Sequence, residues 1–297
     1  MKSIFLKSPA KINLYLGILG KRKDSFHEIV TIFEKISLSD EIKIISTNSG
    51  RIIVKSNKFI CPPEKNIAFK AANLIFSNYN IKSGLEIDIV KKIPIGSGLG
   101  GGSSNAAAVI CGLNKLYKLK LSQSEMLKLA ATLGSDVPFF ICNSTFAAGT
   151  GRGEKIESIP SNIRLWHVLL FPGFSMSTKD IYSSCNINKI PLKRLTAINE
   201  DVKILTLNLK NGNLAFVMKN LYNDLEKVAV KKYNKIAYFM RLLKKCGIEK
   251  PLLTGSGSVI FGTIKTRKEA TKVDNKLRET LRDSGKRQWN TYIVHTL

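Results

Sequence analysis

The glycine-rich segment at residues 94–105 constrains the fold of this chain more than any other feature. It reads PIGSGLGGGSSN, follows the strand-like alternation of residues 85–90, and precedes an alanine-rich helical stretch from about 104 to 117. Glycines allow positive φ angles and let backbone N–H groups approach an anion closely. A helix start adds unpaired N–H donors and the positive end of the helix dipole. The segment therefore predicts a phosphate-binding loop between a strand and a helix rather than a flexible turn.

The spacing within this loop excludes several well-known classes. Gly96, Gly98 and Gly101 fit the dinucleotide pattern G-x-G-x-x-G, but the acidic residue expected about 20 positions later at a strand end is absent. A Walker A loop requires a lysine followed by Ser or Thr, and none follows these glycines. The H-R-D and D-F-G signatures of protein kinases are also missing. The loop therefore needs a different assignment.

The order of predicted elements favours an α+β fold with two domains. A chain of 297 residues is long enough for two domains, and the polar stretch near 155–163 separates two structured halves. We therefore expect domains at residues 1–158 and 159–297. Apolar periodicity, capping residues and turn signals predict the elements. They are strands at 3–19 (broken at Ser8-Pro9), 28–36, 41–46, 51–55, 85–90, 144–149, 166–171, 258–264 and 289–295, and helices capped by Asn66, opened by Ser122-x-x-Glu125, and near 231–245 and 267–282.

The charge balance is strongly basic. Lys and Arg number 47 against 22 Asp and Glu, which gives a formal net charge of +25. Such an excess is typical of proteins that bind nucleic acid or an anionic surface. Here the basic residues are spread along the whole chain in clusters of two or three, such as Lys91-Lys92 and Lys244-Lys245. We interpret most of this charge as solvated surface and expect no nucleic-acid partner. A specific polyanion is the alternative.

The cysteines and apolar runs indicate where the protein works. No C-x-x-C pair is present, so neither a zinc site nor a disulfide framework is predicted, and a reducing cytoplasm fits best. The longest apolar runs, such as residues 166–171, are far shorter than the roughly 20 residues that span a bilayer. No signal-peptide pattern is visible. We expect a cytoplasmic protein with no membrane partner; its cysteines are Cys61, Cys111, Cys142, Cys185 and Cys246.

The whole glycine-rich run resembles the second motif of GHMP kinases, P-x-G-x-G-L-G-S/G-S-S. Three further segments, in the expected order, resemble motifs of the GHMP kinases that act on a diphosphocytidyl sugar alcohol. They are residues 8–14 (SPAKINL), 134–140 (GSDVPFF) and 253–258 (LTGSGS). The chain departs from the family pattern at Ser25, at Ser135 and across residues 149–154.

This resemblance implies a two-domain GHMP kinase fold and an ATP-dependent kinase. The expected reaction is phosphorylation of the 2-hydroxyl of 4-diphosphocytidyl-2-C-methyl-D-erythritol, within the non-mevalonate isoprenoid route. A homoserine or mevalonate type of GHMP kinase is one alternative. A basic RNA-binding protein of related fold is another. We expect a small-molecule substrate and a monomer or weak homodimer.

The resemblance implies catalytic roles for Lys11 and Asp136. Phosphoryl transfer needs an in-line hydroxyl, charge neutralisation and a proton acceptor, and Asp136 is the candidate acceptor. Its alternative is capping of the short helix before Pro138. Lys11 beside it would lower the pKa of the substrate hydroxyl, and its alternative is an edge-strand lysine facing water. Asn13, two residues on, projects from the same strand face and could orient that hydroxyl.

The resemblance also implies a substrate pocket. His27 would hydrogen-bond the cytosine, since ring nitrogens can both donate and accept, and Phe26 and Tyr182 would stack on that base. Alone, each would more often belong to a core. Residues 253–258 resemble the third GHMP motif and are named the third-motif loop. Thr178 and this loop would close the substrate side through Gly255, Ser256 and Gly257. His167 and His295 are interpreted as structural.

ATP would bind along the glycine-rich loop. Asn66 and Lys91 would lie near the adenine. No carboxylate cluster suits Mg²⁺, so no metal ligand set is predicted, and phosphate oxygens with Ser103 or Ser104 would coordinate it. The expected phosphate contacts are Pro94, Gly96, Gly98, Leu99, Gly100, Gly101, Gly102, Ser103 and Ser104.

Overall fold

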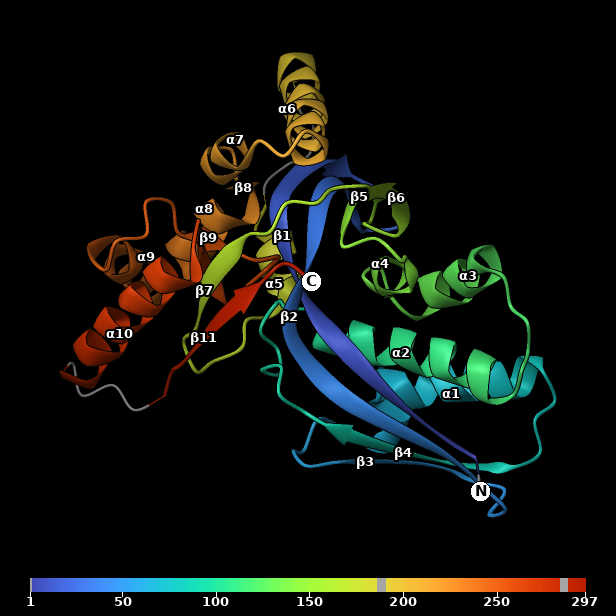
Figure 1. Ribbon diagram of the computed structural model, residues 1–297. Helices are drawn as coiled ribbons and strands as arrows, with labels where there is room; N and C mark the ends of the chain where they lie inside the picture. Colours follow the sequence, from blue (N-terminus) through green and yellow to red (C-terminus); the bar gives the residue numbers. More distant parts are fainter. Residues whose placement is uncertain (1, 186–190, 284–287) are drawn as a thin grey trace.

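The computed structural model describes residues 2–185, 191–283 and 288–297 (Figure 1). Its larger sheet has the strand order β3-β4-β2-β1-β8, with β5 paired to β2 and β6 paired to β5. The strands are β1 (Ser3–Lys21), β2 (His27–Thr47), β3 (Ile52–Ser56), β4 (Gly84–Val90), β5 (Phe146–Gly151), β6 (Lys155–Ile159) and β8 (Tyr222–Asn223).

A smaller sheet with the order β11-β7-β10-β9 is formed by the second half of the chain. Its strands β7, β10 and β11 pair antiparallel. Figure 1 shows this sheet and its helices on one side of the long β1–β2 pair, with α1 to α4 on the other side. The strands are β7 (Trp166–Phe171), β9 (Leu252–Leu253), β10 (Ile260–Ile264) and β11 (Asn290–His295).

The helices cover the sheets with apolar faces. Ala71, Ile75 and Val109 of α1 and α2 share a buried cluster with Ile44 and Ile87 of the larger sheet, the arrangement that amphipathic helices adopt on a sheet. The first half contains η1 (Pro63–Lys65), α1 (Ile67–Asn78), α2 (Gly101–Leu116), α3 (Gln123–Leu133) and α4 (Val137–Ile141). The second half contains α5 (Thr178–Ser183), α6 (Leu192–Lys210), α7 (Leu214–Lys219), α8 (Leu225–Lys232), α9 (Asn234–Lys245) and α10 (Arg267–Asp283).

The helix caps predicted at Asn66 and Ser122 are confirmed, whereas the helix expected near 231–245 begins only at Asn234. The Asn66 side chain caps α1 by accepting from the Ala68 N–H at 2.9 Å, and Ser122 and Glu125 form a capping box at α3. Helix α2 begins at Gly101, three residues earlier than expected, with Gly100 in the left-handed conformation as its N-cap. Among the described residues, none of the helices has the length and apolar character needed to cross a membrane.

The predicted breaks in the first two strands are wrong. β1 continues through Ser8-Pro9, and residues 28–36 and 41–46 belong to one strand, β2. The pairing register shifts between Pro9 and Ala10. A proline has no N–H to donate to the neighbouring strand, and an irregularity of this kind accommodates it without ending the strand. The two strands therefore form one long curved ribbon that reaches both halves of the molecule.

The chain passes from one sheet to the other between β6, which ends at Ile159, and β7, which begins at Trp166. The chain nevertheless returns to the first sheet, since β8 pairs with β1. Ile12 and Leu14 of β1 also share one buried cluster with Leu169, Phe261 and Val294 of the second half. The division at residue 158 stays a prediction, and the two halves pack on a common core.

Candidate active site

Lys11 and Asn13 lie on the same face of β1, as alternate strand residues do. The buried Lys11 ammonium donates to the Asn13 Oδ1 atom at 2.7 Å. The Asn13 amide donates to the Thr31 hydroxyl at 2.8 Å, and the Asn13 backbone N–H donates to the Thr254 hydroxyl at 3.1 Å. Three separate segments thus fix the amide with its oxygen toward Lys11.

Asp136 occupies the N-cap position of α4, but its side chain makes no capping hydrogen bond. Its Oδ2 atom instead lies 3.5 Å from the Lys11 Nζ atom. The Asp136 side chain is 34% exposed, whereas that of Lys11 is 4% exposed. The helix-capping alternative is therefore wrong, as is the alternative that Lys11 faces water. A carboxylate that opens to solvent on one side contacts a buried cation on the other.

The glycine-rich loop takes the conformation that its sequence predicts. Gly96, Gly98 and Gly100 have φ angles of 65°, 81° and 70°, in the left-handed region that favours glycine. A Cβ atom on Gly98 would lie 2.6 Å from the Thr254 carbonyl oxygen and 2.8 Å from that of Gly257. Only a glycine therefore lets this loop rest on the third-motif loop.

The loop also lies against Lys11 and presents free amides. The Lys11 backbone N–H donates to the Leu99 carbonyl at 2.9 Å. The Ser104 N–H bonds to the Gly100 carbonyl, so the amides of Gly101, Gly102 and Ser103 precede the first intrahelical hydrogen bond of α2, where partners are lacking. These donors and the helix dipole suit an anion placed beside the Lys11–Asp136 pair.

Three predicted nucleotide contacts already have partners inside the protein. The Lys91 ammonium pairs with the fully buried Asp40 carboxylate, the Asn66 side chain caps α1, and the buried Ser104 hydroxyl accepts from Ser8 at 2.7 Å. Part of the hydrogen-bonding capacity of these groups is therefore already used within the protein. Ser103, which is only partly buried, is the hydroxyl that remains at the helix start.

The predicted residues of the substrate side come together from distant segments. The Thr178 hydroxyl lies 2.8 Å from the Ser256 hydroxyl. Gly255 lies so close to the pair that a Cβ atom there would be 3.4 Å from the Asn13 Oδ1 atom and 3.4 Å from the Lys11 Nζ atom. Gly257, at φ 88°, faces Met176. The third-motif loop therefore borders both the glycine-rich loop and the Lys11–Asn13 pair.

Two of the three rings predicted to bind the base, His27 and Tyr182, contact each other, and the third, Phe26, does not share this contact. The ring of the buried His27 lies 5.2 Å from the Tyr182 ring. Phe26 is 52% exposed, and the Arg152 guanidinium lies 4.8 Å from its ring centre. Burial raises the pKa of the Tyr182 phenol, and the charge of Asp136 adds to the rise. His27 and Tyr182 are therefore neighbours in a region that the charge of Asp136 reaches, whereas the Phe26 ring contacts Arg152.

Sequence reasoning missed several residues of this region. Thr254 directly precedes the third-motif glycines, so its position was a usable signal. Arg152 lies in the segment 149–154 that departs from the family pattern. Thr31, in the middle of β2, carried no local signal. His167 was interpreted as structural, and it is fully buried with its Nε2 atom 3.0 Å from Glu34.

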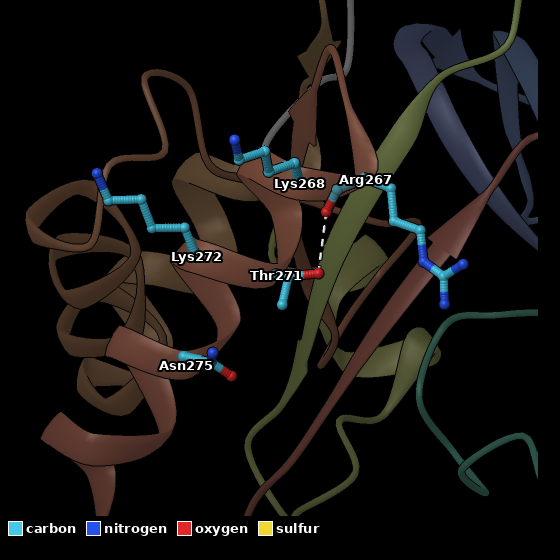
Figure 2. Close-up of a pocket in the computed structure, with 5 residues that line it drawn as sticks. All are labelled: Arg267, Lys268, Thr271, Lys272 and Asn275. Carbon is cyan, nitrogen blue, oxygen red and sulfur yellow. Dashed lines mark hydrogen bonds between the residues drawn. The ribbon is translucent and has the colours of Figure 1, made fainter.

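A hollow on α10 is no rival to this region. Among the described residues, no group of three or more His, Cys, Asp or Glu side chains could hold a metal ion. Figure 2 shows an open hollow on α10, where Thr271 donates to the Arg267 carbonyl at 3.0 Å. The hollow contains neither an acid nor a base suited to proton transfer at neutral pH. Its lining residues are Arg267, Lys268, Thr271, Lys272 and Asn275.

Comparisons with known proteins define the class. The chain matches the family described as "GHMP kinases N terminal domain" over residues 66–144 and "GHMP kinases C terminal" over residues 206–283. A crystal structure of a homoserine kinase from Cytophaga hutchinsonii superposes with a TM-score of 0.75 over 100% of this chain and 95% of that chain. Its 18% identity makes this a likeness of fold alone. The fold and the two matched regions are those of a GHMP kinase.

Closer relatives narrow the assignment. A Geobacillus sp. (strain WCH70) protein named 4-diphosphocytidyl-2-C-methyl-D-erythritol kinase is 37% identical, with 93% of each chain covered. A protein of that name from Syntrophomonas wolfei is 37% identical over 93% of this chain and 95% of its own length. A crystal structure of a 4-(cytidine 5'-diphospho)-2C-methyl-D-erythritol kinase superposes with a TM-score of 0.77 at 27% identity, over 98% of this chain and 99% of that chain. This chain belongs to the 4-diphosphocytidyl-2-C-methyl-D-erythritol kinase family.

Proposed function

We propose that this protein transfers the γ-phosphoryl group of ATP to the 2-hydroxyl of 4-diphosphocytidyl-2-C-methyl-D-erythritol, a step of the non-mevalonate isoprenoid precursor pathway. The observation that carries the proposal is the contact of the Asp136 carboxylate with the buried Lys11 ammonium at 3.5 Å. This pair lies directly beside a loop built to hold an anion. Membership of the kinase family supports the same reaction.

In the proposed reaction, Asp136 accepts the proton of the substrate 2-hydroxyl. The hydroxyl oxygen forms a new bond to the γ-phosphorus, and the bond from that phosphorus to the β-phosphate oxygen breaks, which releases ADP. The Lys11 ammonium stabilises the negative charge that develops on the attacking oxygen and the moving phosphoryl group. Asn13 keeps the Lys11 ammonium in place through its hydrogen bond of 2.7 Å.

The nucleotide would be held mainly by backbone amides. The amides of residues 101–103 would donate to phosphate oxygens at the start of α2, and the left-handed glycines before it permit the close approach. Mg²⁺ would neutralise phosphate charge, with phosphate oxygens and the Ser103 hydroxyl as ligands, since hard oxygen ligands suit this ion. Asn66 would contact the adenine through its amide N–H₂ group, since only its oxygen caps α1, whereas the Lys91 ammonium would have to share its charge with Asp40.

The cytidine end of the substrate would occupy the aromatic region. His27 would read the cytosine edge, and Phe26 and Tyr182 would provide stacking faces. Thr178, Ser256 and the flanking glycines would close the methylerythritol side. The charge of Asp136 acts on the Tyr182 phenol and raises its pKa, which supports a substrate that extends from the base to the reacting hydroxyl.

The setting of the protein is also a proposal. We infer a cytoplasmic monomer or weak homodimer with no nucleic-acid or membrane partner. All five cysteines are unpaired, which suits a reducing compartment. The dispersed basic residues would serve as solvated surface and would raise the local concentration of anionic substrates.

The test is a substrate panel. The protein is incubated with ATP, Mg²⁺ and one of four alcohols: the cytidine-tagged substrate, untagged methylerythritol, homoserine or mevalonate. ADP is measured by a coupled assay and the product by phosphorus NMR. We expect a phosphorylated product from the tagged substrate alone, and equal turnover of an untagged alcohol would reject the substrate assignment. A salt-sensitive RNA complex without any ATP turnover would favour the RNA-binding alternative.

A further inference from the structure

A second lysine holds the helix that carries the candidate proton acceptor. Lys35 on β2 is the direct cross-strand partner of Lys11 on β1, so both side chains leave the same face of the ribbon. The Lys35 ammonium donates to the carbonyl oxygen of Cys142, the C-cap residue of α4. Lys11 contacts Asp136 at the opposite end of this helix.

Two aromatic rings separate the two lysines. Phe33 of β2 and Phe139 of α4 stack with their ring centres 4.8 Å apart. The Lys11 Nζ atom lies 5.5 Å from the Phe33 ring centre, and the Lys35 Nζ atom lies 5.3 Å from that of Phe139. Each ammonium therefore contacts a different ring of one stack. This stack joins the middle of α4 to the β1–β2 ribbon.

A helix of five residues does not hold its own position. Nucleation of a helix is unfavourable, and isolated helices much shorter than about 12 residues are unstable in water. A positive charge at the C-terminal carbonyls stabilises a helix, and Lys35 supplies that charge. Burial lowers the pKa of Lys35, although the nearby Cys142 and Cys111 act against this. The ammonium therefore sits where water competes poorly for the Cys142 carbonyl.

We propose that Lys35 is a positioning residue for phosphoryl transfer, which acts by fixing α4 so that the Asp136 carboxylate faces Lys11. Loss of this anchor lets the N-terminal end of α4 shift relative to β1. A displacement of about 1 Å of a reacting group can cost about a hundredfold in rate. This inference rests on the proposed role of Asp136 as proton acceptor.

The experiment measures kcat and both KM values in Lys35→Met and Lys35→Arg. Lys35→Met keeps the apolar stem and removes the charge, and we expect kcat to fall between about tenfold and a hundredfold, with the KM of ATP changed less than about twofold. Lys35→Arg keeps a charged donor, so the fall in log kcat should be at most half of that in Lys35→Met. The matched control is Lys43→Met, because Lys43 lies on the same strand, with its Nζ atom 5.2 Å from the Phe5 ring centre, and should keep its activity.

A double mutant separates positioning from folding. If Lys35 acts through Asp136, then Lys35→Met should reduce single-turnover rates less than about twofold in an Asp136→Asn background, because contacts that act together are not additive. Full multiplication of the two effects would overturn the proposal. So would a Lys35→Met protein whose melting temperature falls while kcat per folded molecule stays at the wild-type value. A fully active Asp136→Asn protein would instead reject the proposed role of Asp136 as proton acceptor, while the substrate panel tests the proposed function independently.

Discussion

Substitution of Gly98 by alanine tests whether the phosphate loop depends on its contact with the third-motif loop. Gly98 has a φ angle of 81°, and a Cβ atom there would lie 2.6 Å and 2.8 Å from the carbonyl oxygens of Thr254 and Gly257. Both atoms belong to the backbone, so neither can move aside as a side chain could. The two loops must separate, and the hydrogen bond from the Val259 N–H to the Ser97 carbonyl, 3.1 Å long, must break or stretch.

The cost has two parts. A left-handed conformation costs a non-glycine residue about 1–2 kcal/mol, and overpacking a tight contact costs a further 1–3 kcal/mol or so. The total of roughly 2–5 kcal/mol is expected to lower both stability and nucleotide affinity. Since about 1.4 kcal/mol is tenfold in affinity, ATP binding should weaken between about fivefold and sixtyfold if half of this cost must be met when the loop closes on the nucleotide.

The assay combines thermal unfolding with calorimetric titration of ATP into the folded protein. Gly102→Ala is the matched control for stability, because its Cβ atom would meet only the Ile67 Cγ2 atom, at 3.5 Å. Alanine is favoured over glycine in a helix by up to about 1 kcal/mol, so this control should unfold at the same temperature or higher. A Gly98→Ala protein with wild-type melting temperature and ATP affinity within twofold would refute the reasoning.

Three other predictions address the reaction and the base pocket. Asp136→Asn should reduce kcat by about a hundredfold or more and leave ATP affinity nearly unchanged; a kcat within tenfold of wild type would exclude the proton-acceptor role. Phe26→Ala should raise the KM of the cytidine-tagged substrate between about fivefold and a hundredfold, because base–aromatic stacking contributes roughly 1–3 kcal/mol, whereas Phe26→Tyr should be nearly neutral; an unchanged KM in Phe26→Ala places the base elsewhere. Burial, with the charge of Lys21, lowers the pKa of His27, so the ring is neutral above about pH 6.5. The KM of the tagged substrate should therefore be flat from neutral to alkaline pH and change only as the pH falls through that lowered pKa. A pH profile with its change above pH 7 would contradict this.

Local signals in the sequence carried much of the site. The two-residue spacing of Lys11 and Asn13 placed both side chains on one strand face, and their hydrogen bond confirms it. The glycines at 96, 98 and 100 were expected to allow a left-handed backbone, and all three adopt it. Asn66 and Ser122 were correctly predicted as helix caps. Each of these features depends on residues within a few positions of one another, which is the range over which sequence patterns constrain structure.

Features that depend on distant pairing were not predictable in the same way. The Lys91–Asp40 pair joins residues 51 positions apart, and it turns a candidate nucleotide contact into a buried ion pair. Ser104 was expected to face phosphate, but the direction of its hydroxyl is set by Ser8, 96 positions away. The return of β8 to the first sheet likewise depends on tertiary packing. No periodicity or capping signal encodes such contacts, because they arise from how complete elements pack.

The contacts of the third-motif loop argue against a simple division into an ATP-binding half and a substrate-binding half. The Thr254 hydroxyl accepts from the Asn13 backbone, and the carbonyls of Thr254 and Gly257 limit the space at Gly98. The second half therefore shapes both the phosphate loop and the residue that positions Lys11. Conversely, β1 supplies buried residues to the common core that includes Phe261 and Val294. Since Lys11 and Asn13 alternate along β1 with Ile12 and Leu14 of this core, a substitution that loosens the packing of the two sheets should shift these two candidate residues and lower catalysis before it unfolds either half.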